Sequence, residues 1–117
     1  MDERERMRAG LAEKAMGWTV DDSHFGYYRN ANGGTIGTPH NGDLTRDDWQ
    51  PDESWEQCGL VIEAMRAKGW DWSVEEYPDD IIGICLHKDG RYVWGDAEDE
   101  RYARMMTAAI ALEATDD

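Results

Sequence analysis

A helix predicted between Asp52 and Trp70 is the feature that most constrains what this chain can fold into. Acidic residues stand in its first turns, Arg66 and Lys68 stand in its last, and Gly69 follows them. This order of charges suits the helix dipole, and a glycine after the last turn is a common helix end. We therefore expect a helix over residues 52–68 at the centre of the fold, with its apolar face covered. That face, at helical spacing, comprises Trp55, Cys58, Ile62 and Met65.

Amphipathic helices are also predicted near both ends of the chain. Apolar side chains recur every three or four residues in each, which is helical spacing. The first helix is expected over residues 2–16 and ends at Gly17. The last helix is expected over residues 97–113. Gly95 and Asp96 are expected to end the preceding strand and to cap this helix. The apolar faces are Met7, Leu11, Ala15 and Trp18 in the first helix, and Tyr102, Met105, Ala109 and Leu112 in the last.

The remaining segments predict strands. A turn at Asn30–Gly34 indicates a weak hairpin over residues 25–38, followed by a loop over 39–50. Because short turns join antiparallel neighbours, the later strands form a meander. At 117 residues the chain is one domain, 1–117, with an α/β fold of the α+β type. A small antiparallel sheet of three to five strands packs with three helices in a sandwich-like arrangement. Either the helices cover both faces of the sheet, or two helices cover one face. The later strands are expected over 70–77, 81–87 and 91–94.

The charge balance narrows the classes of partner. The chain has 26 acidic and 12 basic residues, a formal net charge of −14. Nucleic acids and anionic membranes bind cationic surfaces, so direct contact with either is not expected. No apolar run approaches the roughly 18 residues of a membrane-spanning helix. Cys58 and Cys85 stand in apolar runs, which favours buried free thiols in a reducing cytoplasm over a disulfide.

No residue pattern predicts a catalytic, metal or cofactor-binding site. The three histidines have no second His or Cys at metal-ligand spacing. The acidic segments 43–48 and 96–100 lack the spacing of a calcium loop. Residues 33–38 resemble a phosphate-binding loop only in their glycines, since the lysine and the helix that complete such a loop are missing.

Five short segments fall in a recognisable order along the chain. They are Ala12–Trp18 (AEKAMGW), Trp49–Gln57 (WQPDESWEQ), Val61–Trp70 (VIEAMRAKGW), Gly95–Glu98 (GDAE) and Ala108–Ala114 (AAIALEA). In this order they resemble the phage α/β/α sandwich domain family, which comprises small phage and prophage proteins of unassigned function. The resemblance implies a fold and a phage origin. It implies no shared enzymatic activity and supplies no catalytic residue.

We therefore expect an accessory protein that acts by binding and is not an enzyme. Its surplus acidic residues gather in segments 43–56, 71–80 and 96–100. A continuous negative surface would attract the basic surface of a host protein or nucleoprotein complex whose natural partner is nucleic acid. The predicted role is an anti-CRISPR-like inhibitor of a host defence nuclease complex in the cytoplasm of the bacterial host. The expected partner-binding residues are Asp47, Asp48, Trp49, Glu75, Glu76, Asp79 and Asp80.

Three alternatives stay open at this point. The chain could instead sequester a nucleotide signal, with the turn over residues 30–38 and His40 lining the site. The acidic residues could serve solubility alone, because a net charge far from zero keeps proteins dispersed. The functional unit could also be a homodimer, which the sequence neither requires nor excludes.

Overall fold

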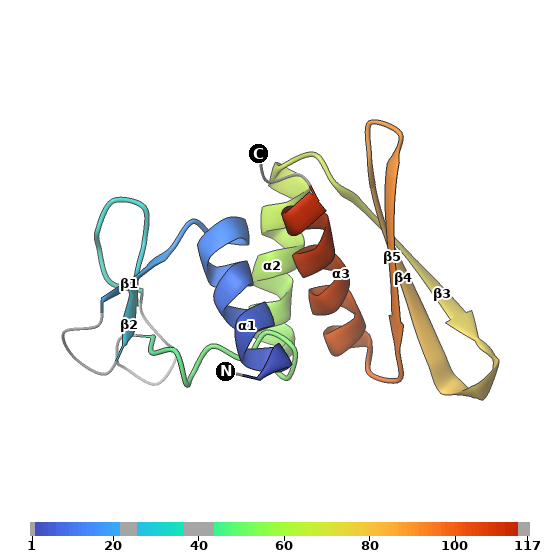
Figure 1. The fold of residues 1–117 in the computed structure, drawn as a ribbon, viewed down its shortest axis with the longest axis horizontal. Coiled ribbons are helices and arrows are strands. Elements are labelled where there is room, and N and C mark those ends of the chain that lie inside the picture. Colours follow the sequence, from blue (N-terminus) through green and yellow to red (C-terminus); the bar gives the residue numbers. More distant parts are fainter. Residues whose placement is uncertain (1, 22–25, 37–43, 115–117) are drawn as a thin grey trace.

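The computed structural model describes residues 2–21, 26–36 and 44–114. The helices are α1 (Glu3–Gly10), α2 (Trp55–Ala67) and α3 (Glu100–Ala114), and the strands are β1 (Thr19–Asp21), β2 (Tyr27–Arg29), β3 (Asp71–Tyr77), β4 (Ile81–Lys88) and β5 (Arg91–Ala97). The molecule is elongated, with principal extents of 45 × 31 × 26 Å. The hairpin of β1 and β2 stands at one end, the sheet of β3, β4 and β5 stands at the other, and the helices lie between them (Figure 1). The predicted α+β class, with small antiparallel sheets and three helices, is confirmed.

The first helix extends beyond α1. Leu11–Ala15 continues it as a π-helical turn, which buries Leu11, Ala12 and Ala15 in the core. Gly17 follows with φ +73°, a left-handed conformation that glycine adopts without steric cost. The helix expected over residues 2–16 therefore covers Glu3 to Ala15.

The second helix begins at Trp55, not at Asp52 as predicted. Ser54 caps it, because the Ser54 hydroxyl accepts a hydrogen bond from the N–H of Gln57 at 3.3 Å. Asp52 lies in the turn before the helix, where the N–H groups of Glu53 and Ser54 donate to the Gln50 carbonyl, and its carboxylate is paired with arginines of α1. Trp55 is 54% exposed, so its predicted place on the covered face is wrong. The buried face of α2 comprises Cys58, Val61 and Met65.

The three-stranded sheet has β4 at its centre, between β3 and β5. β5 runs to Ala97, beyond the predicted end at Trp94, because it stays paired with β4 as far as Ala97. Gly95 and Asp96, which were expected to end the strand and cap α3, are therefore part of the strand. Asp99 caps the helix instead, with its carboxylate accepting a hydrogen bond from the N–H of Arg101 at 2.8 Å.

The helix at the centre of the molecule is α3, and the expectation that the helix over 52–68 takes this place is wrong. α3 packs on β4 and β5 and also contacts α1 and α2. The absence of a side chain at Gly95 of β5 allows this close approach, since a side chain there would collide with Thr107 of α3. Exposed large apolar residues remain on both helices, with Trp55 and Leu60 on α2 and Ile110 on α3. The buried residues of α3 are Ala103, Met105, Thr107, Ala108, Ala111 and Leu112.

The predicted hairpin over residues 25–38 is formed in part within the described residues. A single antiparallel bridge joins Arg29 to Thr35 across the Asn30–Gly34 turn, but β2 pairs along its length with β1, a partner that was not predicted. The ring of Trp18, just before β1, lies 5.6 Å from the Tyr28 ring and 4.8 Å from the Trp49 ring. All three of these aromatic residues are buried. This aromatic cluster therefore attaches the hairpin to the helices.

A buried carboxylate joins the segment before α2 to α1. Asp52 is fully buried and accepts hydrogen bonds from Arg8 Nε at 2.7 Å, Arg8 Nη2 at 3.0 Å and Arg4 Nη1 at 2.7 Å. The Arg8 carbonyl also accepts a hydrogen bond from the Trp49 indole at 2.9 Å. Burial raises the pKa of Asp52, but its hydrogen bonds, chiefly those from Arg8, outweigh burial and leave the pKa below its usual value. Asp52 is therefore a charged group of the core.

Replacement of this carboxylate should destabilise the fold. We expect Asp52→Asn to lower the free energy of unfolding by about 2–4 kcal/mol. This is somewhat less than the usual cost of breaking a buried ion pair, because both arginines keep access to water. Urea denaturation measures the loss. The matched control is Glu53→Gln, which removes an exposed partner of Arg8 and should cost less than about 1 kcal/mol. Equal losses in the two variants would contradict the assigned role of Asp52.

The same group predicts a pH dependence. The folded-state pKa of Asp52 lies below the reference value of 3.8. The contribution of Asp52 to the free energy of unfolding is therefore complete above pH 3.8 and is lost as the pH falls through the folded-state pKa. The difference in unfolding free energy between the wild type and Asp52→Asn should therefore be constant from neutral pH down to about 5 and shrink below 3.8. Urea titrations at a series of pH values test this. A difference that grows on acidification would reverse the sign and contradict the pairing.

Candidate functional site

The three-stranded sheet has one covered face and one open face. Leu86 and Ile84 of β4 are buried toward α3, and their partners by register include Trp72 and Val93, which pack on the same core. Since side chains alternate along a strand, the intervening residues point the other way. We call this opposite side the outer sheet face. Its residues by register are Ser73, Glu75, Tyr77, Ile81, Gly83, Cys85, His87, Tyr92, Trp94 and Asp96.

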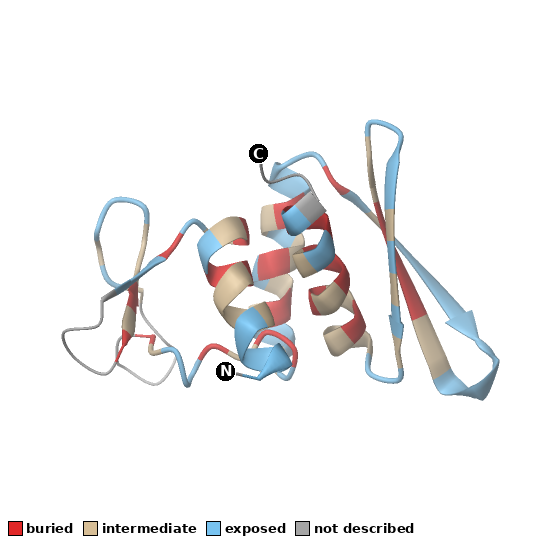
Figure 2. Ribbon diagram, in the orientation of Figure 1, coloured by how far each residue is buried: buried red, intermediate tan, exposed pale blue. Residues whose placement is uncertain are grey.

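Aromatic rings are exposed on the outer sheet face. Tyr92 is 64% exposed, Trp94 is 54% exposed and Tyr77 is 42% exposed. Trp94, in a strand that the sequence predicts, is therefore not a core residue. In Figure 1 every described helix lies on the α3 side of the sheet, so an arrangement with helices on both faces is wrong. Figure 2 shows the exposed residues of β3 and β5 on either side of the buried centre of β4.

A notch is formed on this face where the sheet has no side chain. The ring of Tyr77 lies over Gly83, so close that a side chain added at Gly83 would collide with the ring. The Tyr77 hydroxyl donates a hydrogen bond to Glu75 at 2.8 Å, which holds the ring in this position. This bond, with desolvation and nearby negative charge, raises the pKa of Tyr77. The notch has a volume of about 190 Å³ and is lined by Tyr77, Gly83, Trp94, Gly95 and Asp96.

Two carboxylates stand on either side of Gly83 at the notch. Glu75, Gly83 and Asp96 stand in one row across the three strands, so two acidic side chains flank a glycine on the outer face. Among the described residues, none of these carboxylates takes part in an ion pair with a lysine or arginine. The turn after β3 adds two more acids in left-handed conformation, with φ 72° and 60°. We call Glu75, Glu76, Asp79, Asp80 and Asp96 the acidic rim.

The structure divides the predicted partner-binding residues into two groups. Glu75, Glu76, Asp79 and Asp80 lie together at one end of the three-stranded sheet. Asp47 and Asp48 belong to the segment that leads from the β1–β2 hairpin to α2, toward the opposite end of the long axis (Figure 1). Asp48 accepts a hydrogen bond from the Thr45 hydroxyl at 2.9 Å and so stabilises its own turn. The expected continuous acidic surface over both groups is therefore not formed.

Trp49 requires a separate correction. It was expected as an exposed anchor for a partner, but it is fully buried and donates its indole hydrogen bond to Arg8. Conversely, sequence reasoning missed Trp94, Gly83 and Asp96 as components of one site. The available signal was the alternation of aromatic and acidic residues, Glu75 with Tyr77 and Trp94 with Asp96, in two strands of one meander. That signal needs the register between the strands before it places the four side chains together.

The other candidates from the sequence show no shared site in the described residues. His24 and His40 lie outside the described ranges, and His87 stacks on Tyr92 with ring centroids 5.8 Å apart. No group of three or more His, Cys, Asp or Glu within the described ranges could hold a metal ion. In the same part of the chain, no helix is long and apolar enough to cross a membrane.

The glycine-rich turn satisfies its own hydrogen bonds. The Asn30 side-chain oxygen accepts from the N–H of Asn32 at 2.9 Å and from that of Gly34 at 3.0 Å. The N–H of Gly33 donates to the Asn30 carbonyl at 2.9 Å. These N–H groups are therefore occupied in this structure and do not form an open phosphate cradle. The predicted site continues into residues 37–40, which lie outside the described ranges, and it stays a prediction.

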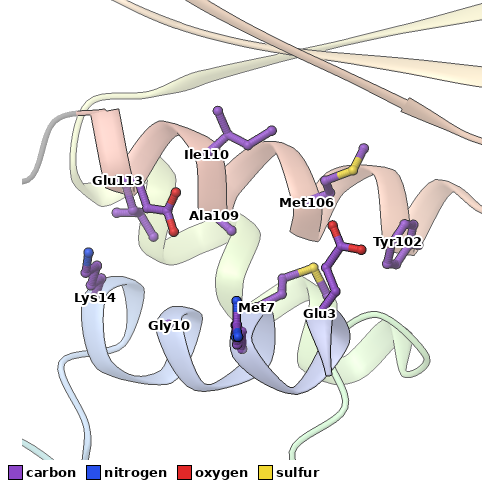
Figure 3. A pocket seen from close by; sticks show the side chains of 11 residues that line it. Glu3, Met7, Gly10, Lys14, Tyr102, Met106, Ala109, Ile110 and Glu113 are labelled. Carbon is purple, nitrogen blue, oxygen red and sulfur yellow. The ribbon is translucent and has the colours of Figure 1, made fainter. Parts of the chain in front are cut away.

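A second hollow lies between α1 and α3. Figure 3 shows its side chains coming from both helices, with Met7 on one side and Met106, Ala109 and Ile110 on the other. Its volume is about 290 Å³. The charged residues at its edge cancel, since Glu3 and Glu113 are balanced by Arg6 and Lys14. This groove has no net charge with which to select a ligand, whereas the acidic rim carries charge of one sign.

Comparison with known proteins agrees with the architecture. A phage protein from Bacillus cereus ATCC 14579 has a similar crystal structure, with a TM-score of 0.62 and 14% sequence identity over 93% of this chain and 91% of that chain. No protein-family model and no curated protein matches this sequence. At this identity the likeness shows a shared fold and no more. The α+β architecture is therefore one that a phage protein also uses.

The two cysteines are buried free thiols, as the sequence predicts. Cys58 lies on the buried face of α2, and Cys85 lies at the centre of β4. Burial raises the pKa of Cys58 to about 11. Burial also raises the pKa of Cys85, with a smaller contribution from the negative charge of Glu75. Because the thiolate is the reactive form, neither side chain is suited to act as a nucleophile at neutral pH.

Alkylation tests this assignment. We expect iodoacetamide at about pH 8 to modify both cysteines in urea and to modify the native protein at least about 100-fold more slowly, because a raised pKa and burial each suppress the reaction. Intact-mass measurements over time give the two rates. Rapid modification of one cysteine in the native protein would identify a reactive thiol and contradict the assignment.

Proposed function

We propose that this chain is a phage-encoded accessory protein that acts by binding the basic surface of a host protein or nucleoprotein complex, and that it is not an enzyme. In its finer form, the proposal is an anti-CRISPR-like inhibitor of a host defence nuclease complex. The protein would act in the cytoplasm of the bacterial host. Its carboxylates would compete for the cationic channel that such a complex offers to nucleic acid.

The acidic rim at one end of the three-stranded sheet is the observation that supports this proposal most directly. Two of its carboxylates, Glu75 and Asp96, lie on the open face with exposed Tyr77 and Trp94, and aromatic residues are enriched at the centres of protein interfaces. Unpaired charges of one sign raise the rate of encounter with a partner of opposite charge. The similar fold of a phage protein, together with the short segments that resemble a phage family, supports the phage origin.

Neutralisation of four of the five residues of the acidic rim should strongly reduce inhibition. The variant Glu75→Gln, Glu76→Gln, Asp79→Asn, Asp80→Asn removes four charges and keeps the shape of each side chain. Asparagine tolerates the left-handed backbone at Asp79 and Asp80. In phage plating assays on hosts with guide-RNA-directed nuclease systems, we expect the wild-type protein to raise plating efficiency against at least one system. The neutralised variant should lower that gain at least about tenfold while keeping its melting temperature, since surface changes rarely affect folding by more than about 0.5 kcal/mol.

The matched control removes the same number of charges elsewhere. It carries Glu13→Gln, Glu56→Gln, Glu63→Gln and Glu113→Gln, all at exposed positions outside the acidic rim and outside the predicted partner-binding residues. This control should keep most of the protection. If both variants lose protection equally, net charge and not the rim is responsible. If the wild-type protein protects phage against none of the systems, the inhibitor proposal is wrong.

A further inference from the structure

We infer that the notch between Tyr77 and Trp94 is a receptor for an arginine side chain of the partner protein. The guanidinium group would lie against the two aromatic rings and pair with the Asp96 carboxylate. This inference rests on the proposed function for the identity of the partner as a basic protein. The chemistry of the notch can nevertheless be tested without that partner.

One wall of the notch, the Tyr77 ring, is held in place before any ligand arrives. Tyr77 crosses from the edge strand over Gly83, and its hydrogen bond to Glu75 fixes the ring there. Trp94 and Asp96 are two residues apart on β5, so both side chains point to the same face. The sheet backbone thus presents two aromatic groups and one carboxylate around a floor without a side chain. A preformed site of this kind loses little conformational entropy on binding.

Aromatic rings elsewhere in this chain already carry cations. The guanidinium of Arg101 lies 5.6 Å from the centre of the Trp55 ring, and that of Arg104 lies 5.3 Å from the Trp72 ring. The ammonium group of Lys88 lies 6.0 Å from the Trp70 ring. Trp94 is as exposed as Trp55, at 54%, yet no cation of the described residues lies over its ring. An electron-rich ring beside a carboxylate attracts a cation, and here that cation must come from another molecule.

The dimensions and charge of the notch select the kind of ligand. Its volume of about 190 Å³ is below the roughly 300–1,000 Å³ of small-molecule sites, so a nucleotide would not fit within it. One amino-acid side chain would. Asp96 and Glu75 exclude an anionic group and favour a cation. A guanidinium suits the notch better than an ammonium, because it is planar, stacks on aromatic faces and pairs with a carboxylate through two hydrogen bonds.

Nuclear magnetic resonance of the tryptophan indoles tests the inference. The probe is the capped peptide Gly-Gly-Arg-Gly-Gly, and its neutral match carries citrulline in place of arginine. In ¹⁵N-labelled protein, the Trp94 indole signal, assigned with Trp94→Phe, should shift in a saturable manner with the arginine peptide. The Trp55 indole is the internal control, because it is equally exposed and already carries Arg101. Its signal should stay in place, and the citrulline peptide should shift neither signal.

Two substitutions locate the effect in the notch. Asp96→Asn removes the protein's carboxylate from the proposed ion pair with the arginine peptide and should raise the dissociation constant about two- to fivefold. Gly83→Ala should also raise the dissociation constant, because the added methyl group displaces the Tyr77 ring. Unchanged affinity in Asp96→Asn, or equal shifts of the two indoles, would overturn the inference. Equal affinity for a lysine peptide would overturn the choice of arginine.

The outcomes separate this inference from the proposed function. If phage protection depends on the acidic rim but the notch binds no arginine peptide, the inhibitor proposal stands and the arginine-receptor inference is wrong. If the notch binds the arginine peptide but the protein protects phage in no host, the inference stands and the inhibitor proposal is wrong. A variant with Asp96→Asn that binds the peptide less tightly and also protects less would connect the two.

Discussion

The ion pair between Asp52 and the arginines of α1 is the contact on which the arrangement of the helices depends. It holds the segment before α2 against α1, and the Trp49 indole strengthens the same junction through the Arg8 carbonyl. The Ser54 cap, two residues further on, marks where α2 begins. With α1 and α2 joined in this way, their apolar faces form one surface for α3.

The position of α3 explains why the molecule has an open sheet face. An alanine-rich helix can be approached closely from two sides, so α3 contacts both the other helices and the sheet. Every described helix is thereby placed on one side of β3, β4 and β5. The opposite side keeps its aromatic and acidic residues exposed to solvent. The candidate site is thus a consequence of how the core is layered.

Charge is distributed according to this layering. The basic residues near the core are engaged, as Arg4 and Arg8 are with Asp52 and as Arg104 is with Glu100 and Trp72. The acidic rim lies at the far end of the sheet, and among the described residues it has no such partners. A chain with a net charge of −14 therefore concentrates part of its surplus beside exposed aromatic rings. That combination supports binding of a basic partner more directly than net charge alone.

The sequence by itself determined the number and order of helices and strands of the meander, the end of the first helix at Gly17 and the burial of both cysteines. These follow from periodicity, turn residues and local polarity, which are properties of neighbours along the chain. Only the tertiary structure decided that α3 and not α2 is central, that Trp49 is buried while Trp55 and Trp94 are exposed, and that Tyr77 lies over Gly83. Each of these depends on contacts between distant segments, whose register and layering cannot be read from local spacing.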